Sequence, residues 1–315
     1  MGVIASRLLQ SLAVLLAMSF IVYGLMGLMP GDPVDLMVAA DPHMSSADAA
    51  RLKALYDLDK PWTERWANWL ARLLQGELGY SRLYARPVAE AMAPALLNTA
   101  VLMITSLGLA LTIALPLGIL AARRPGSLLD RVVNLLAFAS VSVPVFWLGL
   151  MLIVVFAVQL AWLPAGGMEA ITGDQGGRLA HMVLPVSALA LAGIGQYARH
   201  MRAAMMAEAG HDYIRTARAK GCSPARVLLR HQLRNALLPI VTIVALEVGG
   251  LFSGALITET VFSWPGMGRL IYEAVKGNDF NLALSGLLLA TAMTLAGSAL
   301  ADIAYWRLDP RIRGR

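Results

Sequence analysis

The sequence predicts an all-α integral membrane protein with six transmembrane helices. Of its 315 residues, 58% are hydrophobic and only 15% are charged, and the mean hydropathy of +0.64 lies far from that of soluble domains. Six largely uncharged stretches are each long enough to cross about 30 Å of hydrocarbon as a helix. Lys and Arg gather in the connections that would share one side of the membrane, which fixes an orientation.

The predicted spans follow the order of these stretches along the chain. The first, Leu8 to Met29, is interpreted as an anchor, because it is too long for a signal-peptide core and no small-residue cleavage site follows it. The fourth is expected to continue as a helix into the connection behind it. The remaining five spans lie, in order, within Leu96–Ala122, Val132–Leu160, about His181–Tyr197, about Ala236–Val261, and Leu282–Ile303.

Four prolines fall in or at the edges of these spans, and each removes one helical hydrogen bond. Bends around a central path would explain them, and so would bends that only improve packing. They are Pro116, Pro144, Pro185 and Pro239.

The charge distribution predicts that both chain ends are cytoplasmic. With the N-terminus inside, 16 of the 26 basic residues face the cytoplasm with five acidic ones, whereas the other side holds ten basic and fourteen acidic residues. We therefore divide the chain into three parts. Residues 1–95 form the first span and an external segment, residues 96–306 form a five-helix core with a cytoplasmic loop at 199–235, and residues 307–315 form a basic tail.

The external segment from Pro30 to Pro94 is too polar for the membrane. Ser45 and Asp48 resemble a capping box that opens a helix toward Tyr56. After Pro61, one face of a second helix is apolar, which predicts an amphipathic helix. That helix either lies flat on the outer leaflet, where tryptophan is favoured, or packs against the spans of the same chain or of a partner. Its apolar residues are Trp62, Trp66, Trp69, Leu70 and Leu73.

The most basic connection follows the fourth span. Asp212–Lys220 has a helix-forming composition, with an acid at its start and cations at its end, and Gly221 is suited to a left-handed stop. Ser223 then offers an N-cap and Pro224 a first helical position, so a second helix begins there and runs into the fifth span. We predict a rigid helix–glycine–helix elbow. The alternative is that these cations only hold topology or meet anionic lipid.

The same loop carries a resemblance to a known family. The run Tyr213–Gly221, followed by Arg230–Pro239, resembles the signature loop of bacterial ATP-binding-cassette (ABC) importer permeases. The motifs of the whole chain are similar to those of the dipeptide, oligopeptide and nickel permeases, and the external segment points to the B-type, or first, permease of a pair. Further matching motifs are Pro30–Pro33, Gly76–Ser81, Glu259–Gly268 and Leu308–Arg313.

The resemblance implies a type I importer permease fold in the bacterial inner membrane, with both termini cytoplasmic. The implied partners are a second homologous permease, two ABC ATPases and a periplasmic or lipid-anchored substrate-binding protein. The short helix would sit in a groove of an ATPase. Arg215 stands where the family pattern Glu-Ala-Ala…Gly has its glutamate, which is a departure. The implied coupling residues are Asp212, Tyr213, Arg215, Thr216, Ala217, Arg218 and Gly221.

Three acidic residues are further candidates. Glu247 lies near the middle of the fifth span, where an ionisable group is costly and usually functional. It would line the translocation path and meet a substrate amine or a metal ion, or it would form a hydrogen bond between helices. Glu259 and Asp279 lie near the outer edge, where docking of the binding protein or simple solvation would account for them.

No Gly-x-x-x-x-Gly-Lys-Ser/Thr phosphate loop occurs in the sequence. The single Cys222 excludes an intrachain disulfide and a multi-cysteine metal site. We therefore expect no enzyme activity, no metal and no cofactor on this chain, with ATP and Mg²⁺ bound by the partner ATPases. Nucleic acid is not an expected partner, since the basic residues are accounted for by topology.

The expected function is the import of di- or oligopeptides, and the same architecture could carry a nickel chelate, glutathione or a glycoside. Two other classes are disfavoured. An ion-coupled carrier using Glu247 would need inverted repeats, which we do not find. An intramembrane hydrolase would need a nucleophile beside a base, and no Gly-x-Ser-x-Gly elbow is present.

Overall fold

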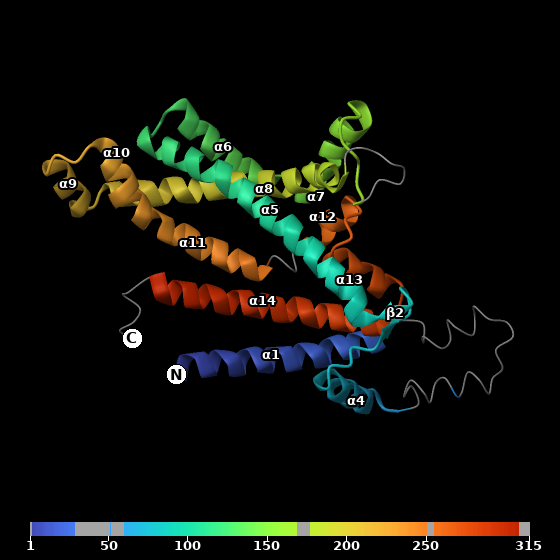
Figure 1. The fold of residues 1–315 in the computed structure, drawn as a ribbon. Coiled ribbons are helices and arrows are strands. Elements are labelled where there is room, and N and C mark those ends of the chain that lie inside the picture. The colour runs from blue at the N-terminus through green and yellow to red at the C-terminus, as the bar shows by residue number, and fades with distance from the viewer. Residues whose placement is uncertain (1, 29–50, 52–59, 169–176, 251–254, 309–315) are drawn as a thin grey trace.

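The computed structural model describes residues 2–28, 51, 60–168, 177–250 and 255–308. Within these ranges the regular secondary structure is helical except for one short antiparallel hairpin, β1 (Tyr80–Ser81) and β2 (Arg86–Pro87). Figure 1 shows long helices side by side, with the hairpin at one end of the molecule and α9 and α10 at the other. The helices are α1 (Gly2–Gly27), α4 (Trp62–Leu74), α5 (Val88–Arg123), α6 (Leu128–Ser142), α7 (Val145–Leu152), π-helical η1 (Ile153–Gln159), α8 (Gly177–Ala209), α9 (Asp212–Ala219), α10 (Pro224–Arg226), π-helical η2 (Val227–Gln232), α11 (Leu233–Gly250), α12 (Leu256–Val261), α13 (Met267–Lys276) and α14 (Phe280–Leu308).

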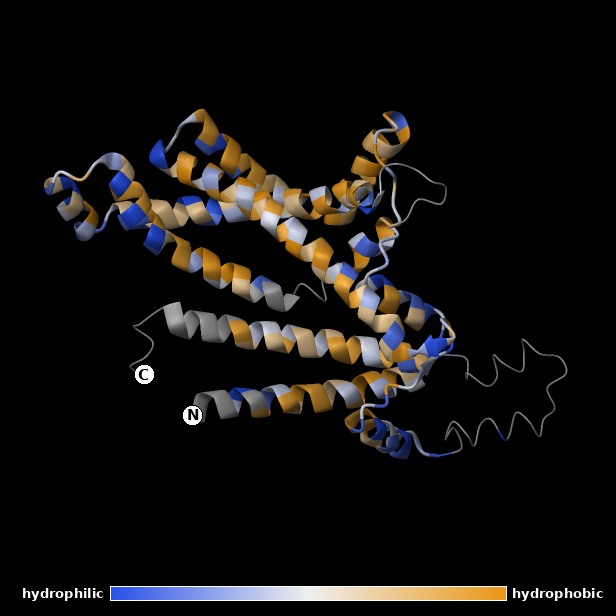
Figure 2. Cartoon of the chain, viewed as in Figure 1, coloured by the Kyte–Doolittle hydropathy of each residue, from blue (hydrophilic) through white to orange (hydrophobic). Residues whose placement is uncertain are grey.

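Four helices of the described ranges are long and apolar enough to cross a membrane, namely α1, α5, α8 and α14. The bent pair formed by α6 and by α7 with η1 is a fifth if it counts as one crossing. Hydrophilic residues cluster around α9 and α10 and around the hairpin, whereas the helices between them are mostly hydrophobic (Figure 2). This distribution is that of a helical membrane protein with two polar ends.

The predicted third span is not one straight helix. It divides into α6 and the segment of α7 and η1, which meet at an angle of 101°. Val143 is extended (φ −98°, ψ 117°) and directly precedes Pro144. A proline ring clashes with a helical conformation of the residue before it, so the helix ends there. Pro116, Pro185 and Pro239, in contrast, lie inside continuous helices.

The fourth predicted span is confirmed as a helix that continues into the basic connection, because α8 ends at Ala209. It packs against α5 and α6 at glycines. A Cβ on Gly118 of α5 would lie 2.5 Å from the Ala198 carbonyl oxygen, and a Cβ on Gly195 of α8 would lie 2.3 Å from the Leu136 carbonyl oxygen. Glycines at these positions let the helix backbones approach closely.

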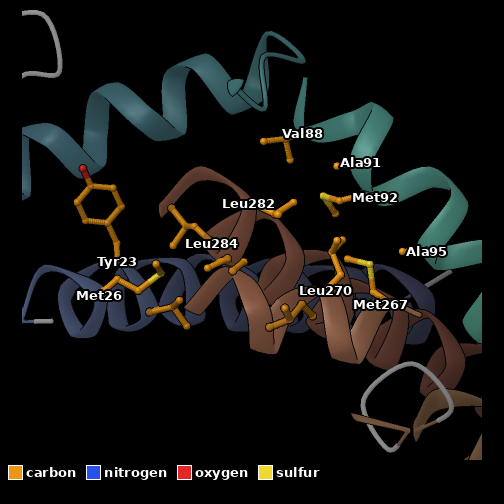
Figure 3. Packing of buried hydrophobic residues seen from close by; sticks show 14 of the residues in the cluster. Tyr23, Met26, Val88, Ala91, Met92, Ala95, Met267, Leu270, Leu282 and Leu284 are labelled. Carbon is orange, nitrogen blue, oxygen red and sulfur yellow. The ribbon is translucent and has the colours of Figure 1, made fainter. Parts of the chain in front are cut away.

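A separate apolar cluster fills the end of the molecule near the hairpin. Figure 3 shows side chains of α1, the first turns of α5, α13 and the start of α14 meeting there, among them Tyr23, Met92, Met267 and Leu282. The cluster packs α1, α13 and α14 against the beginning of α5. The hairpin, which directly precedes α5, therefore adjoins a tightly packed part of the molecule.

The predicted amphipathic helix is confirmed as α4, and its apolar stripe packs against α1. Trp66 Nε1 donates a hydrogen bond to Ser19 Oγ (3.2 Å), and the Trp69 ring lies 6.0 Å from that of Tyr23. Of the two interpretations of this stripe, packing onto a span is the one that the structure contains. The helix expected from Ser45 toward Tyr56 falls outside the described residues.

Candidate functional site

The elbow after α8 forms as predicted. Gly221 has a φ of +79°, in the left-handed region that favours glycine, and its N–H donates to the Arg218 carbonyl (2.9 Å). Ser223 caps the next helix by accepting from the Arg226 N–H (3.4 Å), and Pro224 takes its first position. That helix continues through η2 into α11.

Side-chain contacts tie α9 to both neighbouring helices. The Tyr213 hydroxyl donates to Glu208 of α8 and accepts from Asn235 Nδ2 of α11 (2.9 Å). Burial and the bond to Glu208 raise the pKa of Tyr213, which keeps the donor proton in place. Gln232 Nε2 donates to the Met205 carbonyl (2.7 Å) and joins η2 to the end of α8. The elbow is therefore braced from two sides.

The predicted coupling residues lie on two faces of α9, one buried and one exposed. Ile214 and Ala217 are buried against Val227, with Cys222 beside them, so Ala217 holds the helix in place. The Asp212–Arg215 ion pair (3.4 Å) is highly exposed and contributes little to stability. The outer surface is open to a partner and is formed by Asp212, Tyr213, Arg215, Thr216, Arg218 and Gly221.

A buried ion pair near the elbow was missed by sequence reasoning, which counted its members only as topology charges. Asp130, at the start of α6, is 4% exposed. It accepts from Arg202 Nη2 of α8 (2.9 Å) and Nε, and from the Gly126 N–H (2.8 Å). The sequence carries a signal only for the cap of α6, namely Ser127 three residues before an acid, and Ser127 Oγ does accept from the Asp130 N–H (3.3 Å). The pair fixes the α5–α6 turn to α8.

Glu247 lies between two helices. Its carboxylate accepts a hydrogen bond from the Tyr197 hydroxyl of α8, and the residue is half-buried. The interhelical hydrogen bond considered from the sequence is thus present in the chain. Among the residues that the structure describes, no group of three His, Cys, Asp or Glu side chains is placed to hold a metal ion.

Glu259 is fully buried at the opposite end of the molecule. It accepts from Thr99 Oγ1 of α5 (2.5 Å) and from the Arg269 N–H of α13 (3.0 Å). Thr99 Oγ1 in turn accepts from the Met267 N–H (2.7 Å). Solvation at the outer edge therefore does not explain Glu259. The carboxylate instead joins α12, α13 and α5.

Asp279 is also buried, with 2% exposure. It accepts from Ser81 Oγ (2.5 Å) and from the Leu83 N–H (2.9 Å), both in the hairpin segment. Its other oxygen accepts from the Leu282 N–H in the first turn of α14 (3.3 Å). Solvation is again not the explanation, because Asp279 anchors the hairpin to the start of α14. Neither Glu259 nor Asp279 presents its own side chain to a partner.

Comparison with known proteins identifies the chain. Residues 114–314 match the family of binding-protein-dependent transport system inner membrane components. The chain belongs to this family. The resemblance drawn from its motifs is thereby confirmed, and the protein is a multi-pass component of the bacterial inner membrane.

Curated relatives match along nearly their whole length. The chain is 37% identical to the oligopeptide transport system permease protein AppB of Bacillus subtilis (strain 168), with 98% of each chain covered. It is 36% identical to the di/tripeptide permease DppB of Pseudomonas aeruginosa (strain UCBPP-PA14), again over 98% of each. It is 35% identical to the dipeptide permease DppB of Escherichia coli (strain K12), covering 95% of this chain and 94% of the relative.

The fold is shared with a solved transporter. A chain from an inward-facing structure of the MetNI methionine ABC transporter superposes with a TM-score of 0.53 at 18% identity. The superposition covers 67% of this chain and 93% of the other. At this identity the likeness concerns the fold alone.

Proposed function

We propose that this chain is the B-type permease subunit of an ATP-driven peptide importer. In this proposal six helices cross the membrane, both ends are cytoplasmic, and the chain forms a translocation path together with a second homologous permease. One observation carries the proposal: three relatives that match along at least 94% of their length are permeases of oligopeptide, di/tripeptide and dipeptide transport systems.

The partners in this proposal are two ABC ATPases, which bind ATP and Mg²⁺, and a substrate-binding protein outside the membrane. The exposed face of α9 would dock on an ATPase. Because α9 is held by Tyr213 to both α8 and α11, a displacement of α9 would move these helices with it instead of being absorbed by a flexible loop. This is how ATP-driven closure would reach the membrane.

Glu247 is our proposed residue of the translocation path. Its carboxylate lies between α8 and α11 and would meet the amino group of a peptide. Docking of the binding protein would use the outer surface that Glu259 and Asp279 hold in place, since both side chains are themselves buried. The proposal thus assigns the two carboxylates a positioning role.

The coupling proposal is tested by charge reversal on α9. In the reconstituted importer, Arg215→Glu with Arg218→Glu should abolish ATP-dependent uptake of a labelled tripeptide, because the exposed cationic face would then repel its site on the ATPase. Arg131→Glu, a reversal at an exposed arginine of α6, is the matched control and should transport normally. Gly221→Pro should also uncouple hydrolysis from uptake. Normal uptake in these α9 variants would contradict the proposal.

The substrate class is tested in the same system. Excess unlabelled di- or tripeptide should compete with labelled peptide, whereas a nickel chelate, glutathione or a glycoside should not. Competition by one of the latter and none by peptides would replace the peptide assignment while leaving the importer assignment intact.

A further inference from the structure

The hairpin end of the molecule contains a pocket of about 320 Å³. Its walls come from the segment around β2, the first turns of α5 and the α12–α13 region, with Tyr84, Arg86, Asn98, Arg269 and Glu273 among its lining residues. Since α5 has 36 residues and rises 1.5 Å per residue, it is roughly 54 Å long. The pocket at its start therefore lies at the opposite end of the molecule from the elbow (Figure 1), which is the opposite side of the membrane in the proposed topology.

Most polar groups of the pocket are already paired. Glu273 accepts from the Tyr84 hydroxyl (2.7 Å) and from Arg269 Nε (2.6 Å). Arg269 Nη1 also donates to the Ser263 carbonyl (2.5 Å). Burial, together with the bond to Glu273, raises the pKa of Tyr84 to about 12, so this hydroxyl keeps its proton and remains a donor to Glu273.

Among the residues that line the pocket, Arg86 is the exception. Its guanidinium lies 5.4 Å from the centroid of the Tyr84 ring, and no acidic side chain there pairs with it. Its Nε is shielded from solvent and has no hydrogen-bond partner among the described residues. Because the chain itself shields Nε, an incoming ligand cannot reach that donor. The donors left for a ligand are Nη1 and Nη2, which are not among the shielded atoms and for which the described residues supply no partner.

The backbone of Arg86 is held in position independently of its side chain. Arg86 pairs with Ser81 in the hairpin, and Ser81 is bonded to the buried Asp279. The backbone that carries the cation is thus fixed at the pocket, which removes part of the entropic cost of binding an anion. A guanidinium presents two parallel N–H donors that match a carboxylate.

We propose that this pocket receives an Asp or Glu side chain of the substrate-binding protein, with Arg86 as the residue that binds its carboxylate. The inference rests on the proposed function, which places this end of the molecule outside the membrane. Two observations favour a protein side chain. The pocket is lined by two arginines and one glutamate. Arg269 is bonded to Glu273 and to the Ser263 carbonyl, so Arg86 is the pocket cation that no acidic side chain of the lining neutralises. The volume of the pocket admits one inserted side chain with adjoining atoms.

The test measures affinity between the full importer and the substrate-binding protein of the same transport system. The importer is placed in nanodiscs of phosphatidylcholine and, separately, in nanodiscs that contain phosphatidylglycerol. Arg86→Glu should weaken binding by about tenfold or more, as expected when a charge pair at an interface is reversed, and should reduce the dependence of affinity on salt. Arg86→Lys should lose less affinity than Arg86→Glu, because lysine keeps the charge but lacks the bidentate geometry of a guanidinium.

Lys276→Glu is the matched control. Lys276 is an exposed cation in the last turn of α13 and does not line the pocket, so the same charge change there should leave affinity nearly unaltered. If Arg86→Glu does not assemble, Arg86→Met carries the test, since Asp279 and not the Arg86 side chain anchors the hairpin.

Three outcomes would overturn the inference. They are unchanged affinity of the Arg86 variants, equal weakening by Lys276→Glu, and an effect confined to nanodiscs with phosphatidylglycerol, which would assign the pocket to a lipid headgroup. Failure of the proposed function is distinguishable. In that case the unaltered importer would show no uptake that depends on the binding protein, whereas failure of docking alone would leave that uptake intact.

Discussion

The ion pair of Asp130 and Arg202 joins the α5–α6 turn to α8 near the elbow. The side chains of the pair are 5% and 21% exposed, and removal of one partner leaves a shielded charge. Asp130→Ala should therefore lower the free energy of unfolding by about 3 kcal/mol. The double variant Asp130→Ala with Arg202→Met should lose less than the sum of the single changes.

Thermal unfolding of the purified full-length chain, without its partner subunits, checks this prediction. The control is the exposed Asp212–Arg215 pair, where Asp212→Ala should produce no measurable shift. Equal shifts for Asp130→Ala and Asp212→Ala would show that the buried pair has no special role in stability.

Gly266 is constrained by Glu259 and not by its backbone angles. Its φ of −99° suits any residue, but a Cβ there would lie 2.3 Å from the Glu259 carboxyl carbon. Gly266→Ala should therefore displace the carboxylate from its donors and destabilise the protein by about 2 kcal/mol. Gly210→Ala, whose Cβ would meet its nearest atom at 3.7 Å, should be close to neutral in the same melting experiment. Similar melting temperatures for the two variants would argue against the Glu259 contact.

At the scale of elements, different residues of α9 would contact the partner and hold the helix in place. The exposed residues Arg215 and Arg218 would make the contact, whereas the Tyr213 hydroxyl fastens the helix to Glu208 and Asn235. Tyr213→Phe removes these two hydrogen bonds and keeps the ring. We expect copurification with the ATPases to be retained and the uptake of peptide per ATP hydrolysed to fall several-fold, because a loosened elbow absorbs part of the displacement.

The readout is the ratio of uptake to hydrolysis in proteoliposomes. Tyr272→Phe serves as the control, since Tyr272 is an exposed tyrosine of α13 at the other end of the molecule. A ratio unchanged by Tyr213→Phe would mean that the braces are not needed for coupling.

Elements with local signals were predictable from the sequence. Gly221, Ser223 and Pro224 act on their own backbone, so the elbow and its boundaries followed from them, and the spacing of Trp62, Trp66 and Trp69 predicted α4 in the same way. The division of the third span was harder, because Pro144 can bend a helix or end it. The 101° angle depends on what packs around it.

The candidate site was only partly predictable for the same reason. The positions of Glu259 and Asp279 at the edge of the predicted spans suggested exposure, but their partners come from distant segments. Thr99 precedes Glu259 by 160 residues, and Ser81 precedes Asp279 by 198 residues. No local pattern indicates such pairs, nor the pairing of Asp130 with Arg202.

At the scale of the whole molecule, α8 connects the two polar ends. Its 33 residues span roughly 50 Å and lead from the elbow to the side of the pocket. Along this length it holds Asp130 through Arg202 and Glu247 through Tyr197. At its end away from the elbow, Arg178 Nη2 donates to Asn98 Oδ1 (2.8 Å).

Through the contact of Arg178 with Asn98, α8 would transmit docking of the substrate-binding protein to the ATPases. Asn98 Nδ2 donates to the Pro265 carbonyl (2.9 Å), which links α8 through α5 to the segment before α13. We predict that Arg178→Gln reduces the stimulation of ATP hydrolysis by peptide-loaded binding protein several-fold, while affinity for that protein stays within about twofold, because the helix is freed from the outer surface. Lys276→Gln, the neutralisation of an exposed cation on the same side, should preserve both quantities. Full stimulation in Arg178→Gln would show that the signal crosses the membrane by another helix, and α14, which starts at the Asp279 anchor of the hairpin, would then be the element to test.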